Sequence, residues 1–170
     1  IIFSYLDPPK HYERFLLRRL CRTFRRVLKA AIPSTTFPHP NYPTLNELMD
    51  ALNRVYKKDP MKAPRIVFLM EGTFHGNRYS SVNMSYPLMM IGAGRNKTFL
   101  TGYELCIGGT KEEGKEVVVQ DMTSSGAFYG LYANNGLSFL CKDMTFTQCG
   151  DRGVFAQNTK GRLINCVITQ

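Results

Sequence analysis

Few side chains in this sequence form a pattern that could carry out catalysis. The best-placed carboxylates are Asp121, which follows Gln120, and Asp143. Each stands alone at the edge of a strand-like segment, where an aspartate usually serves as a turn or capping residue. Acid–base hydrolysis requires two converging carboxylates and a group that stabilises the developing charge, and the sequence does not supply that set. We therefore predict a protein without catalytic residues.

The cysteines and histidines do not form a metal-binding pattern. None of the five cysteines belongs to a C-x-x-C pair, and the chain has only three histidines, so we expect neither a metal site nor a cofactor. Because the number of cysteines is odd and several lie in apolar runs, we interpret them as small buried hydrophobic residues. Free thiols are typical of a reducing compartment, and we therefore expect an intracellular protein, cytoplasmic or nuclear.

Positive charge is concentrated in the first 31 residues. This segment carries eight Lys or Arg residues against two acidic ones, in a chain whose net charge is +9. Such an imbalance is typical of an arm that binds a partner, and nucleic acid, an acidic protein surface and anionic lipid are all candidates. No apolar run approaches the roughly 18 residues of a membrane span. Since the chain opens on Ile1 rather than Met, we expect a fragment of a longer protein.

The chain divides into three zones. Residues 1–31 carry apolar residues at spacings of three and four, which predicts a basic amphipathic helical segment. Residues 32–43 contain four prolines and predict an extended linker. Residues 44–170 open with a helix over 44–58, where Thr44 and Glu47 predict a capping box. They continue with short apolar runs separated by Gly, Asn, Ser and Thr, which predict strands.

A repeat of 22 to 23 residues indicates the fold. Residues 143–148 match residues 165–170 at an offset of 22, and Asp-Met-Thr at 121–123 precedes the same tripeptide at 143 by 22. Residues 130–135 match residues 153–158 at an offset of 23. A coil of three short strands and three turns uses about that many residues, since a strand rises about 3.3 Å per residue.

We therefore predict a mainly β domain, a single-stranded right-handed parallel β-helix capped at its N-terminal end by the amphipathic helix at 44–58. Equivalent residues of neighbouring coils would stack about 4.8 Å apart. Met144 and Phe146 would point inward. Asn135, Asn158 and Asn165 would occupy turns, where Asn tolerates a left-handed backbone. The alternatives are a leucine-rich repeat, whose L-x-x-L-x-L-x-x-N pattern is absent, and a chance two-copy match inside another all-β fold.

Three stretches of residues 44–170 resemble a known family. Residues 44–48 and 66–74 (TLNEL and IVFLMEGTF) resemble the start of a pectin lyase-like β-helix, and residues 90–98 (MIGAGRNKT) are similar to that superfamily's IGxGxxxT turn. The resemblance implies the β-helix fold with its helical plug. The Gln-Asp pair at 120 is similar to part of the Q-D-T motif of pectin methylesterases but comes too early in the chain. Catalytic carboxylates of that family would begin about where this chain ends.

The first 31 residues resemble an F-box. Residues 2–9 (IFSYLDPP) and 20–28 (LCRTFRRVL) include its double proline, its Cys-Arg pair and the aromatic residue two positions later. The resemblance implies that this segment binds a Skp-type adaptor through Phe3, Tyr5, Leu6, Pro8, Pro9, Leu20, Cys21, Arg22, Phe24, Arg25 and Arg26. The alternative is a plain basic amphipathic helix, packed on the β-helix or bound to another chain.

F-box motifs followed by right-handed β-helix domains occur in substrate receptors of cullin ubiquitin ligases. The combination therefore predicts a protein-interaction module whose F-box-like helices bind the adaptor and whose β-helix flank binds an unknown substrate protein. The alternatives are a carbohydrate-active protein with catalytic residues beyond this chain, and a basic scaffold subunit that contacts nucleic acid through residues 1–31. Because an open β-helix end exposes strand edges, we also expect the last coil to be covered by further chain or another subunit.

Overall fold

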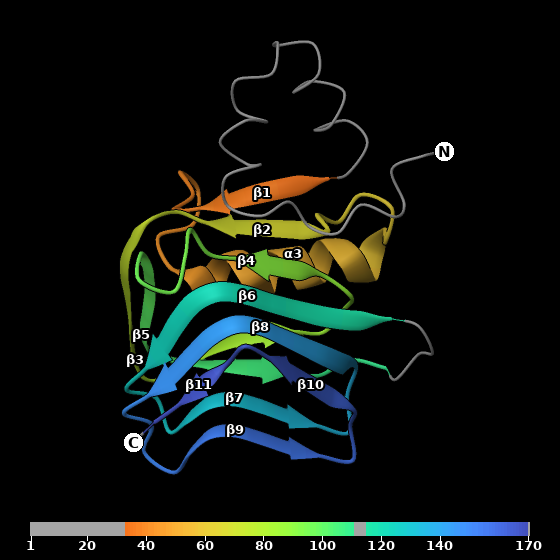
Figure 1. Ribbon diagram of the computed structural model, residues 1–170. Coiled ribbons are helices and arrows are strands. Elements are labelled where there is room, and N and C mark those ends of the chain that lie inside the picture. Colours follow the sequence, from red (N-terminus) through yellow and green to blue (C-terminus); the bar gives the residue numbers. More distant parts are fainter. Residues whose placement is uncertain (1–32, 111–114, 170) are drawn as a thin grey trace. The chain divides into compact units, whose positions relative to one another are not determined.

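The computed structural model describes residues 33–110 and 115–169 (Figure 1). These residues belong to one unit of the chain, Pro33–Gln170. The F-box-like segment at 1–31, with all of its predicted partner-binding residues, lies outside the described residues, so its predicted role is not addressed by the fold.

The described residues form a parallel β-solenoid of about four turns with one helix. Every pairing between its named strands is parallel. The mainly β, parallel β-helix architecture predicted from the repeat is therefore confirmed. The elements are β1 (Ser34–Phe37), α3 (Leu45–Lys58), β2 (Ile66–Leu69), β3 (Gly72–Met84), β4 (Met89–Ile91), β5 (Thr98–Ile107), β6 (Glu116–Ser125), β7 (Tyr129–Asn134), β8 (Ser138–Thr147), β9 (Arg152–Gln157), β10 (Gly161–Ile164) and β11 (Val167–Ile168).

Strand pairing divides the solenoid into three faces. Face 1 contains β1, β2, β4, the first halves of β6 and β8, and β10. Face 2 contains the first parts of β3 and β5, the second halves of β6 and β8, and β11. Face 3 contains the second parts of β3 and β5, followed by β7 and β9. The long strands therefore bend from one face to the next.

Residues with a left-handed backbone mark the three corners between these faces. Each corner stacks one such residue per coil, which explains why the sequence repeats with a fixed offset. Asparagines at the three predicted turn positions all have a φ near +50°, so that prediction is confirmed. The corner residues are Asp121, Asp143 and Asn165 between faces 1 and 2, Gly102, Gly126 and Gln148 between faces 2 and 3, and Gly109, Asn135 and Asn158 between faces 3 and 1.

The core of the solenoid is a stack of inward side chains from successive coils. Met122 and Met144 are register neighbours, and both are fully buried. Phe146 is also fully buried, as the repeat predicts. Burial of each such side chain stabilises the fold by about 1.5–3 kcal/mol, so the repeat carries the stability of the domain along its axis.

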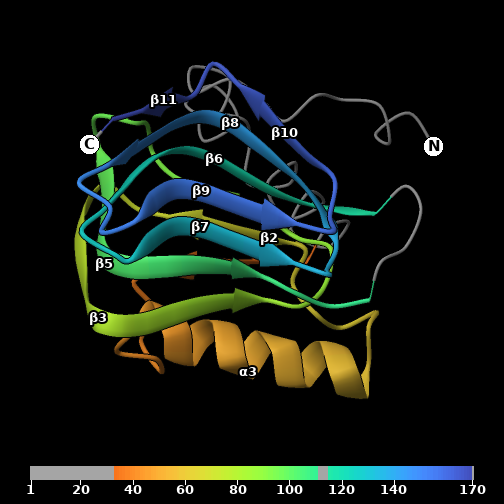
Figure 2. The same ribbon diagram turned by 90° about the horizontal axis from the view of Figure 1, so that it is seen from below.

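The helix α3 covers the N-terminal end of this core. It begins after Thr44, whose hydroxyl accepts a hydrogen bond from the Glu47 backbone N–H at 3.4 Å. Its buried face contributes Leu45, Leu48 and Met49 to the same hydrophobic cluster as the strands. In Figure 2 α3 runs alongside β3, and β5, β7 and β9 follow in order. The predicted helix and its capping position are therefore confirmed.

The Pro-rich stretch 32–43 is not a linker, and this prediction was wrong. Residues 34–37 form β1, which pairs in parallel register with β2 as part of face 1. Phe37 is only 4% exposed and packs edge-on against Phe74, with ring centroids 5.1 Å apart. The physical reason is that three of the four prolines follow Phe37, so the segment before them keeps the backbone N–H groups that an edge strand requires.

Several apolar side chains of the last coil are exposed. Leu163 and Ile164 are each 46% exposed, and Val167 and Ile168 are 42% and 51% exposed. Their register partners one coil earlier belong to β8. That a further segment or subunit covers this coil stays a prediction.

Candidate functional site: a groove on face 3

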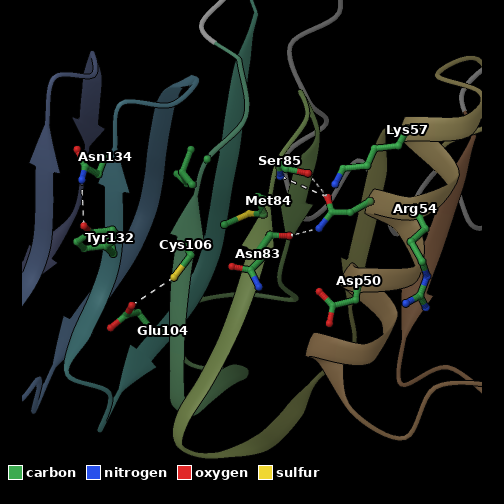
Figure 3. A pocket seen from close by; sticks show the side chains of 13 residues that line it. Asp50, Arg54, Lys57, Asn83, Met84, Ser85, Glu104, Cys106, Tyr132 and Asn134 are labelled. Atoms are coloured by element: carbon green, nitrogen blue, oxygen red, sulfur yellow. Dashed lines mark hydrogen bonds between the residues drawn. The ribbon is translucent and has the colours of Figure 1, made fainter.

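A broad groove lies between α3 and face 3. Its volume is about 710 Å³, and it is lined by residues from α3, β3, β5 and β7 (Figure 3). Lining residues include Asp50 and Lys57 from the helix and Glu104, Tyr132 and Asn134 from the strands. Because the groove brings together side chains that are far apart in the sequence, it exists only once the solenoid has formed.

Strict alternation along face 3 places polar side chains on the outer surface. In β3, Val82 is fully buried and its neighbour Asn83 is exposed. Asn83, Cys106, Tyr132 and Phe155 then occupy equivalent positions of four successive strands. Since successive side chains of a strand point to opposite faces of the sheet, this row forms part of the outer surface of face 3.

Asn53 fixes the helix to the first strand of the groove. Its side-chain amide donates to the backbone carbonyl of Asn83 at 2.8 Å. Its carbonyl oxygen accepts from the Ser85 hydroxyl at 2.7 Å and from the Ser85 backbone N–H at 3.4 Å. These bonds replace solvent contacts on both partners, so the wall and the floor of the groove are held together by one residue.

The exposed charges on the helix wall are not paired. Among the described residues, Asp50, Arg54 and Lys57 make no hydrogen bond, ion pair or ring contact through their side chains. Figure 3 shows the side chains of Asp50 and Lys57 on the side of α3 that faces the strands. An ion pair with a ligand at these positions would therefore not have to break an internal one.

Glu104 on β5 is the most firmly held carboxylate in the groove. One of its oxygens accepts from the Cys106 thiol at 3.2 Å, and the other accepts from the Tyr129 backbone N–H at 3.3 Å. Burial, together with the hydrogen bond and negative charge of Glu104, raises the pKa of Cys106 to about 12. The thiol is therefore neutral at physiological pH and acts as a donor to Glu104 rather than as a nucleophile.

Three aromatic rings continue the surface beyond the groove, and we call them the aromatic ladder: Tyr129, Tyr132 and Phe155. Tyr132 and Phe155 stack with centroids 5.3 Å apart and planes inclined by 8°. Tyr129 lies 5.4 Å from each of them. The guanidinium of Arg152 lies 5.2 Å over the ring of Phe155, which shows that a ring of the ladder can hold a cation.

Sequence reasoning missed both the groove and the aromatic ladder. The signal for the ladder was present in the 23-residue repeat, which aligns Tyr132 with Phe155. The groove left no such signal, because its helix wall and its far side are contributed by Lys57 and Asn134, which belong to different repeats of the chain. Neither the basic nor the aromatic residues predicted to bind a partner lie at this site, since all of those fall within residues 1–31.

The isolated aspartates lie elsewhere, at the corner between faces 1 and 2. Both Asp121 and Asp143 have positive φ angles and stack on consecutive coils, in keeping with their interpretation as turn residues. The Asp143 carboxylate lies 3.5 Å from the Arg95 guanidinium and accepts a hydrogen bond from the Asn165 side chain. The Gln120 amide donates to Asp121 at 2.8 Å. These contacts tie one coil to the next.

Some classes of site find no counterpart in the described residues. Within 33–110 and 115–169, no three or more His, Cys, Asp or Glu side chains gather where they could hold a metal ion. The same stretches contain no helix with the length and apolar character that crossing a membrane requires. The four cysteines that the structure describes are free thiols.

Comparison of the chain with protein-family models, with curated proteins and with solved structures found no match. The F-box-like and pectin lyase-like resemblances therefore rest on the quoted motifs alone.

Proposed function

We propose that this chain is a non-catalytic protein-interaction module that holds a segment of a partner protein on face 3. The observation that carries the proposal is the aromatic ladder, which continues an open groove whose exposed charges have no internal partner. Aromatic residues and arginine supply most of the binding energy at protein interfaces. A small-molecule site would instead enclose most of its ligand, and this groove is broad and open.

The arrangement of a substrate receptor fits this proposal. In it, the F-box-like segment at 1–31 binds a Skp-type adaptor, and the groove on face 3 holds the substrate. The rigid sheet of face 3 favours such a role, because a preorganised surface loses little conformational entropy on binding. The two surfaces would then be separable by mutation.

Two sets of substitutions test this division. The first set, Tyr132→Ala with Phe155→Ala, removes two rings of the aromatic ladder. The second set, Leu20→Ala with Phe24→Ala, removes two anchors of the F-box-like segment. Proteins captured by the full-length chain are quantified by mass spectrometry, and each set serves as the control for the other. Met61→Ala truncates an apolar side chain that is 82% exposed and lies on neither surface, so it controls for lost apolar area.

We expect the ladder variant to lose one group of captured proteins while keeping the Skp-type adaptor. The F-box variant should lose the adaptor and keep that group. Capture that is equal for the wild type and the ladder variant would contradict the role of face 3. Retention of the adaptor by the F-box variant would contradict the receptor arrangement, and turnover of polygalacturonate by the chain would contradict the non-catalytic assignment.

A further inference from the structure

Face 1 differs from face 3 in the chemistry of its outer surface. Along face 3 the strands alternate between apolar and polar residues, whereas the strands of face 1 contain continuous apolar runs such as Ile66–Leu69 and Met89–Ile91. Parallel strands with continuous apolar runs are typical of sheets that are covered on both sides. Face 1 is covered on its inner side by the solenoid core, which leaves its outer side to be explained.

The outer side of face 1 carries an aliphatic row that crosses four strands. Ile66, Met89, Val118 and Leu140 are register partners on β2, β4, β6 and β8. Each of them is half-buried, and none belongs to the hydrophobic core cluster. Isolated apolar side chains are normal on a protein surface, but a contiguous apolar row marks an interaction site.

The size of the row matches a short helix. Three steps between neighbouring strands, at about 4.8 Å each, give a length of about 14 Å. A helix rises about 1.5 Å per residue, so a stripe of about ten residues, or three turns, would cover the row. A shallow hollow of about 270 Å³, lined in part by Met89 and Val118, provides space for a side chain of such a helix.

The rim of the row is positively charged. Arg65 precedes β2, Arg162 is the register partner of Leu140, and Lys142 lies on the next row of β8. Glu116 is the one nearby carboxylate that lines the hollow among the described residues, and it is already bound by Arg162 at 3.0 Å. Lys142 makes no ion pair within the described part of the chain. The rim therefore offers positive charge that a partner with carboxylates would complement.

We propose that the outer side of face 1 is a second docking surface, and that its occupant is an amphipathic helix of a partner protein whose apolar stripe, about three turns long, is flanked by carboxylates. The apolar stripe covers the aliphatic row, and the carboxylates lie against Lys142 and Arg162. This inference does not depend on the groove of face 3, because the two surfaces share no residue.

Three synthetic peptides test the proposal against the full-length chain. The first is a helix of about 14 residues with a leucine stripe at helical spacing and glutamates on both sides of it. The second keeps the stripe and replaces the glutamates by lysines. The third keeps the glutamates and scrambles the stripe. Binding is measured by fluorescence anisotropy in low and physiological salt, with Leu140→Lys, Lys142→Glu and the control Met61→Lys, which changes a residue that is 82% exposed.

We expect the glutamate-flanked helix to bind at least about tenfold more tightly than the other two, a difference of about 1.4 kcal/mol. Leu140→Lys should abolish this binding, Lys142→Glu should weaken it several-fold, and Met61→Lys should leave it unchanged. Equal binding of the lysine-flanked helix, or of the scrambled peptide, would overturn the proposal. If thermal unfolding shows that Leu140→Lys does not fold, Lys142→Glu decides, because its side chain lies on the rim, and unaltered binding by it would also overturn the proposal.

Discussion

The stacking of coils at the corner between faces 3 and 1 makes a quantitative prediction. Gly136 follows the corner residue Asn135, and a Cβ atom added there would lie 2.8 Å from the carbonyl oxygen of Gly108 and 2.9 Å from its carbonyl carbon and its Cα. These are backbone atoms of the preceding coil, which is held in place by a hydrogen bond from the Leu137 N–H to the Gly108 carbonyl at 3.1 Å. The Gly136→Ala substitution must therefore push two coils apart.

The magnitude follows from the contacts that are lost. Overpacking of this kind costs about 1–3 kcal/mol, and weakening one hydrogen bond between coils costs about 1 kcal/mol more. Restricting the unfolded chain offsets about 0.4–1 kcal/mol. We therefore expect Gly136→Ala to lower the free energy of unfolding by about 2 kcal/mol. With an m-value of about 2 kcal/mol/M, the midpoint of urea unfolding, followed by circular dichroism, should fall by about 1 M.

The matched control lies in the preceding coil. A Cβ atom at Gly108 would meet no atom within 4 Å, so Gly108→Ala should leave stability unchanged or raise it by up to about 1 kcal/mol. Equal unfolding midpoints for the two variants would refute the coil stacking described here, and so would a wild-type midpoint for Gly136→Ala.

Four further measurements address the core, the cap, the titrating groups and the ladder. Phe146→Ala should lower the free energy of unfolding by about 3–5 kcal/mol because it empties part of a fully buried stack, whereas Phe128→Ala, at a side chain 47% exposed, should cost far less. Thr44→Ala should cost about 1 kcal/mol by removing the acceptor for the Glu47 N–H, and a change under 0.3 kcal/mol would speak against the cap. The raised pKa of Cys106, about 12, implies that stability falls as pH rises above the usual thiol pKa of about 9, because the unfolded thiol ionises there and the folded one does not; Cys106→Ala should flatten the unfolding profile between about pH 9 and 11. Finally, a double-mutant cycle of Tyr132→Ala and Phe155→Ala should give a coupling energy of about 0.5–1.5 kcal/mol, and additive effects would contradict the stacking.

The sequence was informative wherever structure depends on residues in equivalent positions of the repeat. Asparagines tolerate a left-handed backbone better than most residues, so Asn135, Asn158 and Asn165 could be placed at corners before any coordinates were known. Met144 and Phe146 could be placed inside for the same reason. A repeat determines which residues stack, and stacking is most of what a solenoid needs.

Features that depend on contacts between unlike segments could not be predicted in this way. The strand β1 was hidden by prolines that make residues 32–43 look like a linker, although residues 34–37 before them are free to pair. The groove depends on the bonds from Asn53 to Asn83 and Ser85, two residues on a strand that carries no copy of the helix. No periodicity in the sequence encodes such a contact.

The spacing of the corner residues indicates which part of each coil is free to vary. From the first corner to the second, the two complete coils use the same length, five residues in each of 121–126 and 143–148. From the second corner to the third, across face 3, the length changes from nine residues in 126–135 to ten in 148–158. Face 2 is short, and its inward residues Met144 and Phe146 must keep their register within the core, so an added residue there would turn an apolar side chain outward. The turns that flank the strands of face 3 can absorb added residues without changing that register. The face that carries the groove and the aromatic ladder is therefore also the face on which the fold tolerates change, as expected of a recognition surface built on a rigid scaffold.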